Sequence, residues 1–445
     1  MSGGVDSSVA AALMTREGYE CIGCTMKLLD QNDVDMMDAV CGGGHDSVSG
    51  AEAGALRRPV ADAASGDEFG SARPAHSCCS LDDVEDARSV ARKLGIPYYV
   101  FNFADDFGEK VIDRFVRTYQ AGGTPNPCID CNRYMKFDKL FHRARVLGCD
   151  AVVTGHYARI RHDDRSGRWQ LLRSENKSKD QTYVLYSMTQ EMLSRTLFPL
   201  GVYKDKEAVR ALADEYGFVN SDKPDSQDIC FVQSGKYADF IEKHTGTKAP
   251  WGDFVDEEGH VLGTHKGLIR YTVGQRRGLG LALPAPLYVN RIDTKKNQVV
   301  LTPEERLYSR KLIAEDFNWI WTPDWGEWDT AAGQEFSRDD LKCDQQDDQQ
   351  NTQQNNQQRG VAQPLSDEDA FGMPPHRPPE GYTLEVTAKP RYRAKEAAAT
   401  IRVLEGGKVE VEFHDPQRAL TIGQAVVLYV GDIVVGGGTI SAVPA

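Results

Sequence analysis

The feature that most constrains the fold is a glycine-rich loop that runs directly into a helical pattern. Residues 2–8 read Ser-Gly-Gly-Val-Asp-Ser-Ser, and residues 7–18 carry apolar side chains at helical spacing. Glycine allows positive φ and a close approach of the backbone to a ligand. The first turn of the helix adds unpaired N–H groups and the positive end of the helix dipole. The loop therefore predicts a phosphate site, although it lacks the Gly-Lys-Ser/Thr of a Walker A loop.

Strands and helices alternate through the first half of the chain. Apolar runs predict strands at 19–29, 98–101 and 150–154, and helical patterns occupy about 80–94 and 107–121. This alternation is typical of an α/β fold with a parallel sheet, in which ligands bind at the carboxyl ends of strands. The glycines Gly4 and Gly155 both fall at such ends. We expect this domain to span residues 1–235, with a disordered insertion at about 36–77.

The second half changes to short β-branched runs separated by turn signals. The expected strands are 267–271, 287–292, 298–301, 383–386, 399–403, 409–413 and 425–430. They predict a small central domain over 236–305 and a C-terminal β-barrel over 306–445. A Gln/Asp/Asn tract followed by Pro-rich sequence predicts a second disordered insertion at about 333–379.

The net charge of −14 does not by itself favour a nucleic-acid partner. However, residues 31–75 and 331–380 carry −5 and −6, so the rest of the chain carries only −3. Local basic patches can therefore still meet phosphates. No apolar run reaches the roughly 18 residues of a membrane helix, and no signal-peptide pattern opens the sequence. We expect a cytoplasmic protein without a membrane partner.

Three of the ten cysteines stand out by their surroundings. Cys128 and Cys131 form a C-x-x-C in the string Thr-Pro-Asn-Pro-Cys-Ile-Asp-Cys-Asn-Arg, and Cys230 follows 99 residues after Cys131. A C-x-x-C is typical of half a zinc site or of a redox pair. Zinc or iron–sulfur ligation by Cys128, Cys131 and Cys230 thus stays open beside thiol chemistry. Cys21 and Cys24 lie in a predicted strand, where we expect core positions.

Residues 2–8 resemble the PP-loop of ATP pyrophosphatases, and the chain as a whole resembles the tRNA-specific 2-thiouridylase family. The resemblance covers most of the chain outside the two insertions. It rests on the PP-loop and on the strings at 25–27, 124–137, 154–157, 179–181, 225–231, 274–280, 391–393 and 423–424. It implies an ATP-dependent enzyme that replaces the C2 oxygen of the wobble uridine of tRNA with sulfur.

The resemblance also implies roles for individual residues. The ATP site, with Mg²⁺, would be lined by Met1, Ser2, Gly3, Gly4, Val5, Asp6, Ser7, Met26 and Gly155. Cys230 would carry a persulfide, and Cys131 would form a disulfide with it as sulfur is released. The tRNA would be contacted by Asn126, Pro127, Cys128, His156, Lys179, Asp180, Gln181, Arg391, Tyr392 and Gln424. The implied partners are the anticodon stem-loop of tRNA and a sulfur donor such as a cysteine desulfurase or a sulfur-relay protein.

Two positions depart from the family pattern. Cys128 stands where many members have an Asp that acts as a general base, which favours a [4Fe-4S] cluster or a different proton path. Met1 immediately precedes the PP-loop, where the family has an apolar strand, so we expect a mis-assigned start or a truncated fragment. Two other functions stay open, namely a PP-loop enzyme acting on a small metabolite and a non-catalytic tRNA-binding remnant.

Overall fold

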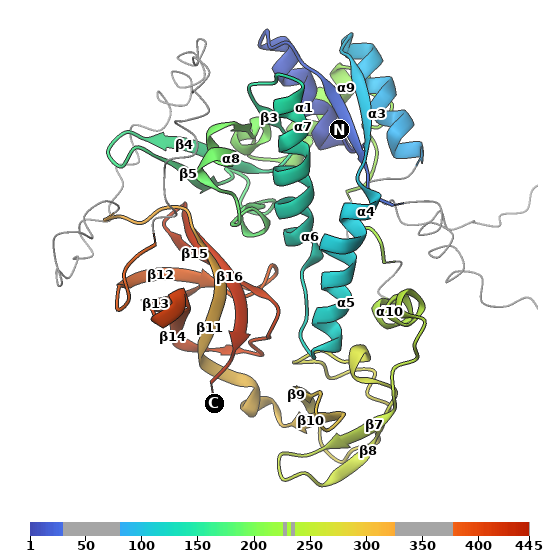
Figure 1. Cartoon of the computed structure of the whole chain (residues 1–445), viewed down its shortest axis with the longest axis vertical. Helices are drawn as coiled ribbons and strands as arrows, with labels where there is room; N and C mark the ends of the chain where they lie inside the picture. Colours follow the sequence, from blue (N-terminus) through green and yellow to red (C-terminus); the bar gives the residue numbers. More distant parts are fainter. Residues whose placement is uncertain (30–80, 226–228, 233–235, 325–376, 445) are drawn as a thin grey trace, which may run out of the picture.

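The computed structural model describes residues 1–29, 81–225, 229–232, 236–324 and 377–444 (Figure 1). The predicted insertion at 36–77, and all of the one at 333–379 except its last three residues, lie outside these ranges. The helices are α1 Val5–Arg16, α3 Leu81–Leu94, α4 Ala104–Phe107, α5 Asp113–Gln120, α6 Pro127–Asp130, α7 Leu140–Val146, α8 Gln190–Ser194, α9 Lys206–Glu215 and α10 Tyr237–Thr245. The strands are β1 Gly23–Lys27, β2 Tyr98–Asn102, β3 Val152–Val153, β4 Ala158–Asp163, β5 Arg168–Arg173, β6 Thr196–Leu197, β7 Gly252–Val255, β8 Val261–His265, β9 Tyr288–Asp293, β10 Gln298–Thr302, β11 Tyr308–Trp319, β12 Thr383–Lys389, β13 Ala397–Val403, β14 Val409–Arg418, β15 Ala425–Val430 and β16 Ile433–Ala442.

The amino-terminal part is α/β with parallel strand pairs, as the alternating pattern predicts. β1 pairs in parallel with β2, and β3 pairs in parallel with β6. Helices α1, α3 and α9 gather beside these strands at the top of Figure 1. Val9 and Leu13 of α1 pack with Val90 of α3 and Val209 of α9 in one buried cluster. Cys21 and Cys24, expected at core positions, are both half-buried, and Cys21 packs against the edge of this cluster.

Two nearly continuous helical columns run down the middle of the molecule (Figure 1). The predicted helix at 107–121 consists of α4, the π-helical turn η1 Gly108–Ile112 and α5. The second column is α6, the π-helical η2 Cys131–Lys139 and α7. Their apolar faces meet through Phe107, Val111, Phe115 and Met135. π-Helical segments are rare and are frequent at functional sites, and one of the two here begins at Cys131.

The central domain is a four-stranded sheet in the order β8-β7-β10-β9, at the bottom of Figure 1. β10 is parallel to β7 and antiparallel to β9. The predicted strand at 267–271 is wrong: Leu268–Arg270 form a 3₁₀ turn, η5. The reason is local, since Gly267 takes a φ of +111° and redirects the chain just where the apolar run begins.

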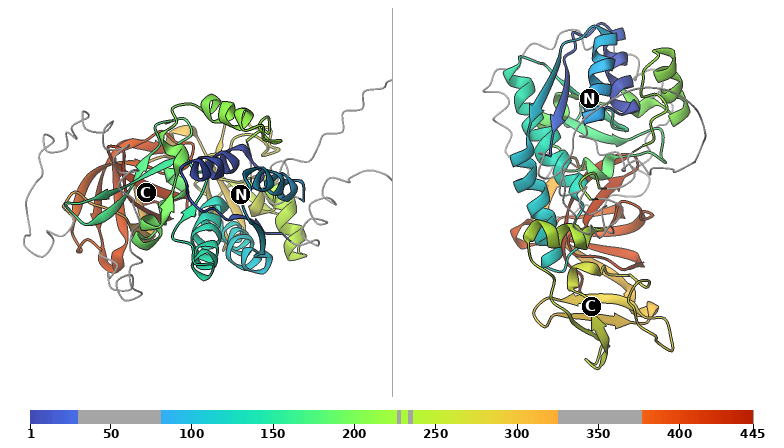
Figure 2. Two further views of the ribbon diagram at one scale, coloured as in Figure 1. Left: turned by 90° about the horizontal axis from the view of Figure 1, so that it is seen from above. Right: turned by 90° about the vertical axis from the view of Figure 1, so that its right-hand side faces the viewer.

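The C-terminal part is a closed six-stranded barrel, which confirms the predicted β-barrel. Its order is β11-β14-β13-β12-β15-β16, and pairing of β11 with β16 closes it. The hairpin β4–β5 of the amino-terminal part extends this sheet through a pairing of Leu172 with Ile433. The barrel packs beside the α6–α7 column, and the two further views show an elongated molecule (Figure 2). A shared core joins the two parts, with Ile129 and Tyr183 from one side and Val427 and Tyr429 from the other.

Candidate functional site

The glycine-rich loop forms an open cradle at the start of α1. Gly3 has a φ of +69° and Gly4 is the N-cap of the helix, so no side chain caps the first turn. Ser7 Oγ accepts a hydrogen bond from Ser2 N at 3.0 Å and donates one to Gly4 O at 3.1 Å, which folds the loop back on itself. A Cβ on Gly4 would meet only Ser2 Oγ, at 3.7 Å. Uncapped N–H groups beside open space suit an anion such as a phosphate.

Gly155 lies directly against this loop, as expected from its place after a strand. A Cβ at this position would come within 2.6 Å of the carbonyl carbon of Asp6 and 2.7 Å of Ser7 N. Only glycine therefore allows the end of β3 to touch the first turn of α1. Two segments predicted to line the ATP site, far apart in the sequence, are thus brought together. Met1 also lies nearby, since its carbonyl accepts a 2.6 Å hydrogen bond from Thr25 Oγ1 of β1, next to Met26.

A polar wall supports the loop from behind. Asn220 Nδ2 donates to Gly3 O at 2.8 Å and to Ser8 Oγ at 3.0 Å. Lys223 Nζ donates to Gly3 O at 3.3 Å and also pairs with the buried carboxylate of Asp83 in α3. Because two donors hold the Gly3 carbonyl away from the cradle, the loop presents N–H groups rather than carbonyls to a ligand. Sequence reasoning missed these residues, since they lie between motifs and only the fold places them here.

A chain of charges links the loop to the segment that carries Cys230. Lys206 Nζ, with only 9% of its side chain exposed, lies 2.6 Å from Asp6 Oδ1 and 2.9 Å from Asp225 Oδ1. Asp225 Oδ2 also pairs with Lys179 at 2.8 Å. The hydrogen bonds from these two lysines hold the pKa of Asp225 below its ordinary value despite burial. Asp225 precedes Cys230 by five residues, so Cys230 lies within roughly 18 Å of it.

His156 and Gln181 form the wall beside Gly155. Burial, reinforced by Lys136, lowers the pKa of His156 well below its ordinary value, so the ring is neutral. Lys136 Nζ donates to His156 Nε2 at 3.4 Å, which leaves the ring proton on Nδ1 to be donated to Thr154 Oγ1 at 2.7 Å. Gln181 Oε1 accepts from the backbone N–H of Tyr157 at 2.9 Å. Tyr157 in turn donates its hydroxyl to Asp6 Oδ1 at 2.8 Å, which ties this wall to the loop.

Two of the three predicted thiols, Cys131 and Cys230, lie in the cluster where the two helical columns meet. Cys128 of α6 is exposed, whereas Cys131 and Cys230 are half-buried and pack against the same apolar cluster around Phe231 and Met135. The described cysteines form no disulfide, so the implied Cys131–Cys230 bridge stays a prediction. Within the described ranges, the one group of three side chains close enough to share a metal ion is Asp256, Glu258 and His260 on the surface, and zinc ligation by the three thiols stays an open alternative.

Asp130, which sequence reasoning passed over, lies between the two thiols of the C-x-x-C. Its side chain is 16% exposed and accepts a hydrogen bond from Arg114 Nε at 3.2 Å. Burial raises the pKa of this carboxyl to about 6, although Arg114 and Arg133 oppose the shift. A carboxyl with such a pKa can exchange a proton near neutral pH. No sequence signal marks it, because its perturbation comes from burial.

The residues predicted to contact tRNA form two groups. Cys128 and Lys179 both lie near the half-exposed Tyr392, since each influences the pKa of its hydroxyl, which burial raises. Others are engaged within the protein: Asp180 is buried and accepts from Ser174 N and Thr182 Oγ1, and Arg391 donates to the carbonyls of Arg418 and Ala419. Gln424 donates to the carbonyl of Thr124, just before Asn126 and the buried Pro127.

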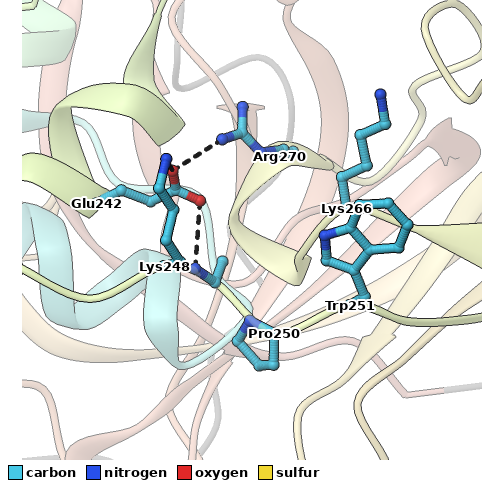
Figure 3. Close-up of a pocket in the computed structure, with 7 residues that line it drawn as sticks. Glu242, Lys248, Pro250, Trp251, Lys266 and Arg270 are labelled. Atoms are coloured by element: carbon cyan, nitrogen blue, oxygen red, sulfur yellow. Dashed lines mark hydrogen bonds and ion pairs between the residues drawn. The ribbon is translucent and has the colours of Figure 1, made fainter.

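A cavity of about 530 Å³ lies elsewhere, in the central domain (Figure 3). Glu242 and Lys248 line one side of it, and the exposed Trp251 and Lys266 line the other. Glu242 is held by Arg270 at 3.1 Å and by Lys248 at 3.4 Å, so an anion entering here would face a paired carboxylate. None of the predicted site residues lines this cavity.

No helix in the described part of the chain is long and apolar enough to cross a membrane.

Comparison with known proteins places this geometry in a family. Residues 1–55 and 63–234 match the model "tRNA methyl transferase HUP domain", residues 238–303 the model "tRNA methyl transferase PRC-barrel domain", and residues 375–440 the model "Aminomethyltransferase beta-barrel domain". The chain is 44% identical to the tRNA-specific 2-thiouridylase MnmA of Acetivibrio thermocellus, over 99% of this chain and 97% of the relative. The relatives of the same name in Clostridioides difficile and Symbiobacterium thermophilum are 41% and 42% identical, over 99% of this chain and 96% and 90% of theirs. The chain therefore belongs to the tRNA-specific 2-thiouridylase family.

Proposed function

We propose that the protein is an ATP-dependent tRNA-uridine 2-sulfurtransferase, which converts the wobble uridine of tRNA to 2-thiouridine. The observation that carries the proposal is the chain Asp6–Lys206–Asp225, which couples an open phosphate cradle to the segment that leads to Cys230. An enzyme that adenylates a base and then delivers sulfur to it needs these two sites within reach of one nucleotide. The names of its relatives support the same reaction.

ATP is expected to place its phosphates at the N-terminus of α1. The N–H groups of Gly4 to Ser7 would bind them, with Ser2 and Ser7 as hydroxyl donors, and Met1, Met26 and Gly155 would line the nucleotide. Asp6 is the acidic side chain of the loop and would hold the Mg²⁺ that accompanies ATP. Its present partner, Lys206, lies 2.6 Å away and would then be available to a phosphate oxygen.

The first step activates a poor leaving group. The C2 oxygen of the flipped uracil attacks the α-phosphate of ATP, pyrophosphate leaves, and a base removes the N3 proton. Pyrophosphate is stabilised by the loop N–H groups and by neighbouring lysines, which compensate its charge. Cys128 occupies the position of the usual general base, and Asp130, with a pKa of about 6, is a second candidate two residues away.

The second step transfers sulfur through two thiols. The terminal sulfur of a Cys230 persulfide attacks C2, and AMP leaves with its oxygen. The Cys131 thiolate then attacks Cys230 Sγ, the sulfur–sulfur bond breaks, and the electron pair stays on the sulfur bound to C2. The products are 2-thiouridine and a Cys131–Cys230 disulfide, which an external thiol must reduce. The persulfide itself comes from a sulfur donor such as a cysteine desulfurase or a relay protein.

The substrate is expected to lie along the surface between the cysteines and the barrel. Asn126, Pro127 and Cys128 would meet the target base. The remaining tRNA contacts would come from His156, Lys179, Asp180, Gln181, Arg391, Tyr392 and Gln424. Tyr392, with 41% of its surface exposed and Lys389 5.7 Å from its ring, offers a stacking face beside a cation.

The test is a thiolation assay with ATP, tRNA and a persulfide donor. Cys131→Ser and Cys230→Ser are expected to abolish thiolation of the tRNA, with tRNA-dependent AMP release measured alongside. Cys149→Ser, a half-buried cysteine that follows the end of α7, is the control and should keep activity. Full thiolation by either catalytic variant refutes the two-thiol scheme. Release of AMP on addition of a small metabolite but not tRNA would favour the metabolite enzyme, and failure to bind ATP would favour the non-catalytic remnant.

A [4Fe-4S] cluster on Cys128, Cys131 and Cys230 is the alternative to the persulfide. No observation on the described residues supports this cluster, and it enters none of the steps above. Iron and acid-labile sulfide, measured in anaerobically purified protein, distinguish the two mechanisms. About four iron atoms per chain would favour the cluster and contradict the persulfide scheme.

A further inference from the structure

We propose that the C-terminal barrel is a positioning element for catalysis, which fixes residues 124–133, here called the cysteine loop, by gripping them at both ends. For its effect on the reaction the inference rests on the proposed function. The cysteine loop belongs to the α/β domain in sequence, yet contacts at both of its ends come from the barrel. The barrel would thereby set the place of Cys131 relative to the bound base.

The first grip lies just before the cysteines. Thr124 N donates to Ile422 O at 2.9 Å, and Gln424 Nε2 donates to Thr124 O at 2.8 Å and to Pro125 O at 3.3 Å. The turn between these barrel residues is close-fitting, because a Cβ on Gly423 would lie 3.1 Å from Thr124 N. Both backbone groups of Thr124 are therefore satisfied by the barrel, which leaves the loop little freedom to slide.

The second grip lies just after Cys131. Arg133 makes a two-pronged pair with Asp316 of β11: Nη1 with Oδ2, and Nη2 with Oδ1 at 3.2 Å. Asp316 holds this geometry by an unusual backbone, a φ of +50° at an irregularity in the β11–β16 pairing. Such a conformation is costly for a residue other than glycine, with Asp and Asn the best tolerated. The hydrogen bond that Arg133 donates to Asp316 raises the pKa of Arg133, which keeps the pair charged.

The bulge around Asp316 is itself seated on the α/β domain. Asn318 Nδ2 donates to Tyr186 O at 2.7 Å and to Met188 O at 3.0 Å. On the neighbouring strand, a Cβ on Gly437 would lie 2.7 Å from the ring of Tyr186, so glycine is needed for this approach. Ile129, between Cys128 and Cys131, is 7% exposed in the core shared with the barrel. The loop is thus fixed before, between and after its cysteines.

Fixing both ends matters because sulfur transfer depends on placement. Cys131 must reach the sulfur of Cys230 while the base is bound, and a displacement of about 1 Å can cost about 100-fold in rate. Cys131 lies two residues from Arg133 and at the start of η2, so weakening the Arg133–Asp316 ion pair should displace this thiol first. The ATP loop shares no contact with Arg133 or Asp316 among those described, so nucleotide binding should be insensitive.

The experiment compares Asp316→Asn with Glu315→Gln. Asparagine tolerates the positive φ and keeps the side-chain size, but it cannot make the charged two-pronged pair. Glu315 is the adjacent residue, and its ion pair with Lys408, at 2.6 Å, stays inside the barrel. For Asp316→Asn we expect the turnover rate of tRNA thiolation to fall about tenfold or more while the KM for ATP stays unchanged. Glu315→Gln should match the parent in both quantities.

A second measurement does not depend on enzymatic activity. The rate of iodoacetamide labelling of Cys131, measured by mass spectrometry relative to Cys149 in the same sample, should change in Asp316→Asn and not in Glu315→Gln. If Asp316→Asn does not fold, Arg133→Lys carries the same test, because lysine keeps the charge but not the fork. Equal turnover rates and equal labelling ratios in the two variants overturn the inference. An inactive parent would contradict the proposed function alone, and the labelling ratio would still decide this inference.

Discussion

The sharpest test of the ATP site is Gly155→Ala, which adds one methyl group where β3 touches the PP-loop. The new Cβ would lie 2.6 Å from the carbonyl carbon of Asp6, whereas ordinary contact begins at 3.4 Å. One of the two backbones must therefore retreat by about 0.8 Å, and neither is the end of a flexible side chain. Overpacking of this kind costs about 1–3 kcal/mol. Because the displaced atoms belong to the phosphate cradle, we expect much of that cost to appear in ATP binding.

Each 1.4 kcal/mol corresponds to a factor of ten in affinity, so the dissociation constant of ATP should rise by about 10- to 100-fold. Isothermal titration calorimetry measures this dissociation constant. Thermal unfolding measures whether the rest of the overpacking cost appears as a loss of stability. Gly108→Ala is the matched control, because a Cβ there meets nothing within 4 Å and the residue is helical. A Gly155→Ala protein with parental ATP affinity and parental unfolding would refute the assignment of Gly155 to the nucleotide site.

Three further predictions concern charge, pH and the barrel seam. Lys206→Met leaves the carboxylates of Asp6 and Asp225 without their shared cation. Because both carboxylates are about one-third exposed, we expect the free energy of unfolding to fall by about 2 kcal/mol, which urea denaturation measures. His156 has a lowered pKa in the folded state, so the unfolded chain binds its proton first; stability is complete above the unfolded pKa of roughly 6.5 and is lost as pH falls below it. His156→Gln should therefore flatten the pH dependence of urea unfolding between pH 7 and pH 5, and an unchanged slope would contradict the neutral buried ring. In Gly437→Ala the new methyl group pushes the barrel away from Tyr186, and the free energy of unfolding should fall by about 1–3 kcal/mol in the same assay. Parental stability would show that the contact between the barrel and Tyr186 can adjust.

The sequence predicted the parts of the fold that depend on local pattern. Residues 425–430 form a continuous apolar run rich in β-branched side chains, as a buried strand should, and β15 spans just these residues. The glycine-rich loop predicted that a helix follows it, which α1 confirms, and it also predicted an anion site, which stays a prediction. Where the pattern was ambiguous the prediction failed: the apolar run at 267–271 became a 3₁₀ turn because Gly267 redirects the backbone.

Only the tertiary structure decided which side chains, distant in the sequence, form ion pairs and which become buried. Lys206, a lysine on an ordinary amphipathic helix, becomes a buried link between Asp6 and Asp225 because α9 packs on α1. Asp130 reads as a spacer within the C-x-x-C, and burial alone makes it a group that titrates near neutrality. Asp316 gains its role from a bulge and a positive φ that the closing of the barrel imposes. The sequence determines the residue types and the local hydrophobic periodicity of this protein. The burial of charged side chains and their ion pairs depend on contacts between segments that are distant in the sequence, so only the tertiary structure decides them.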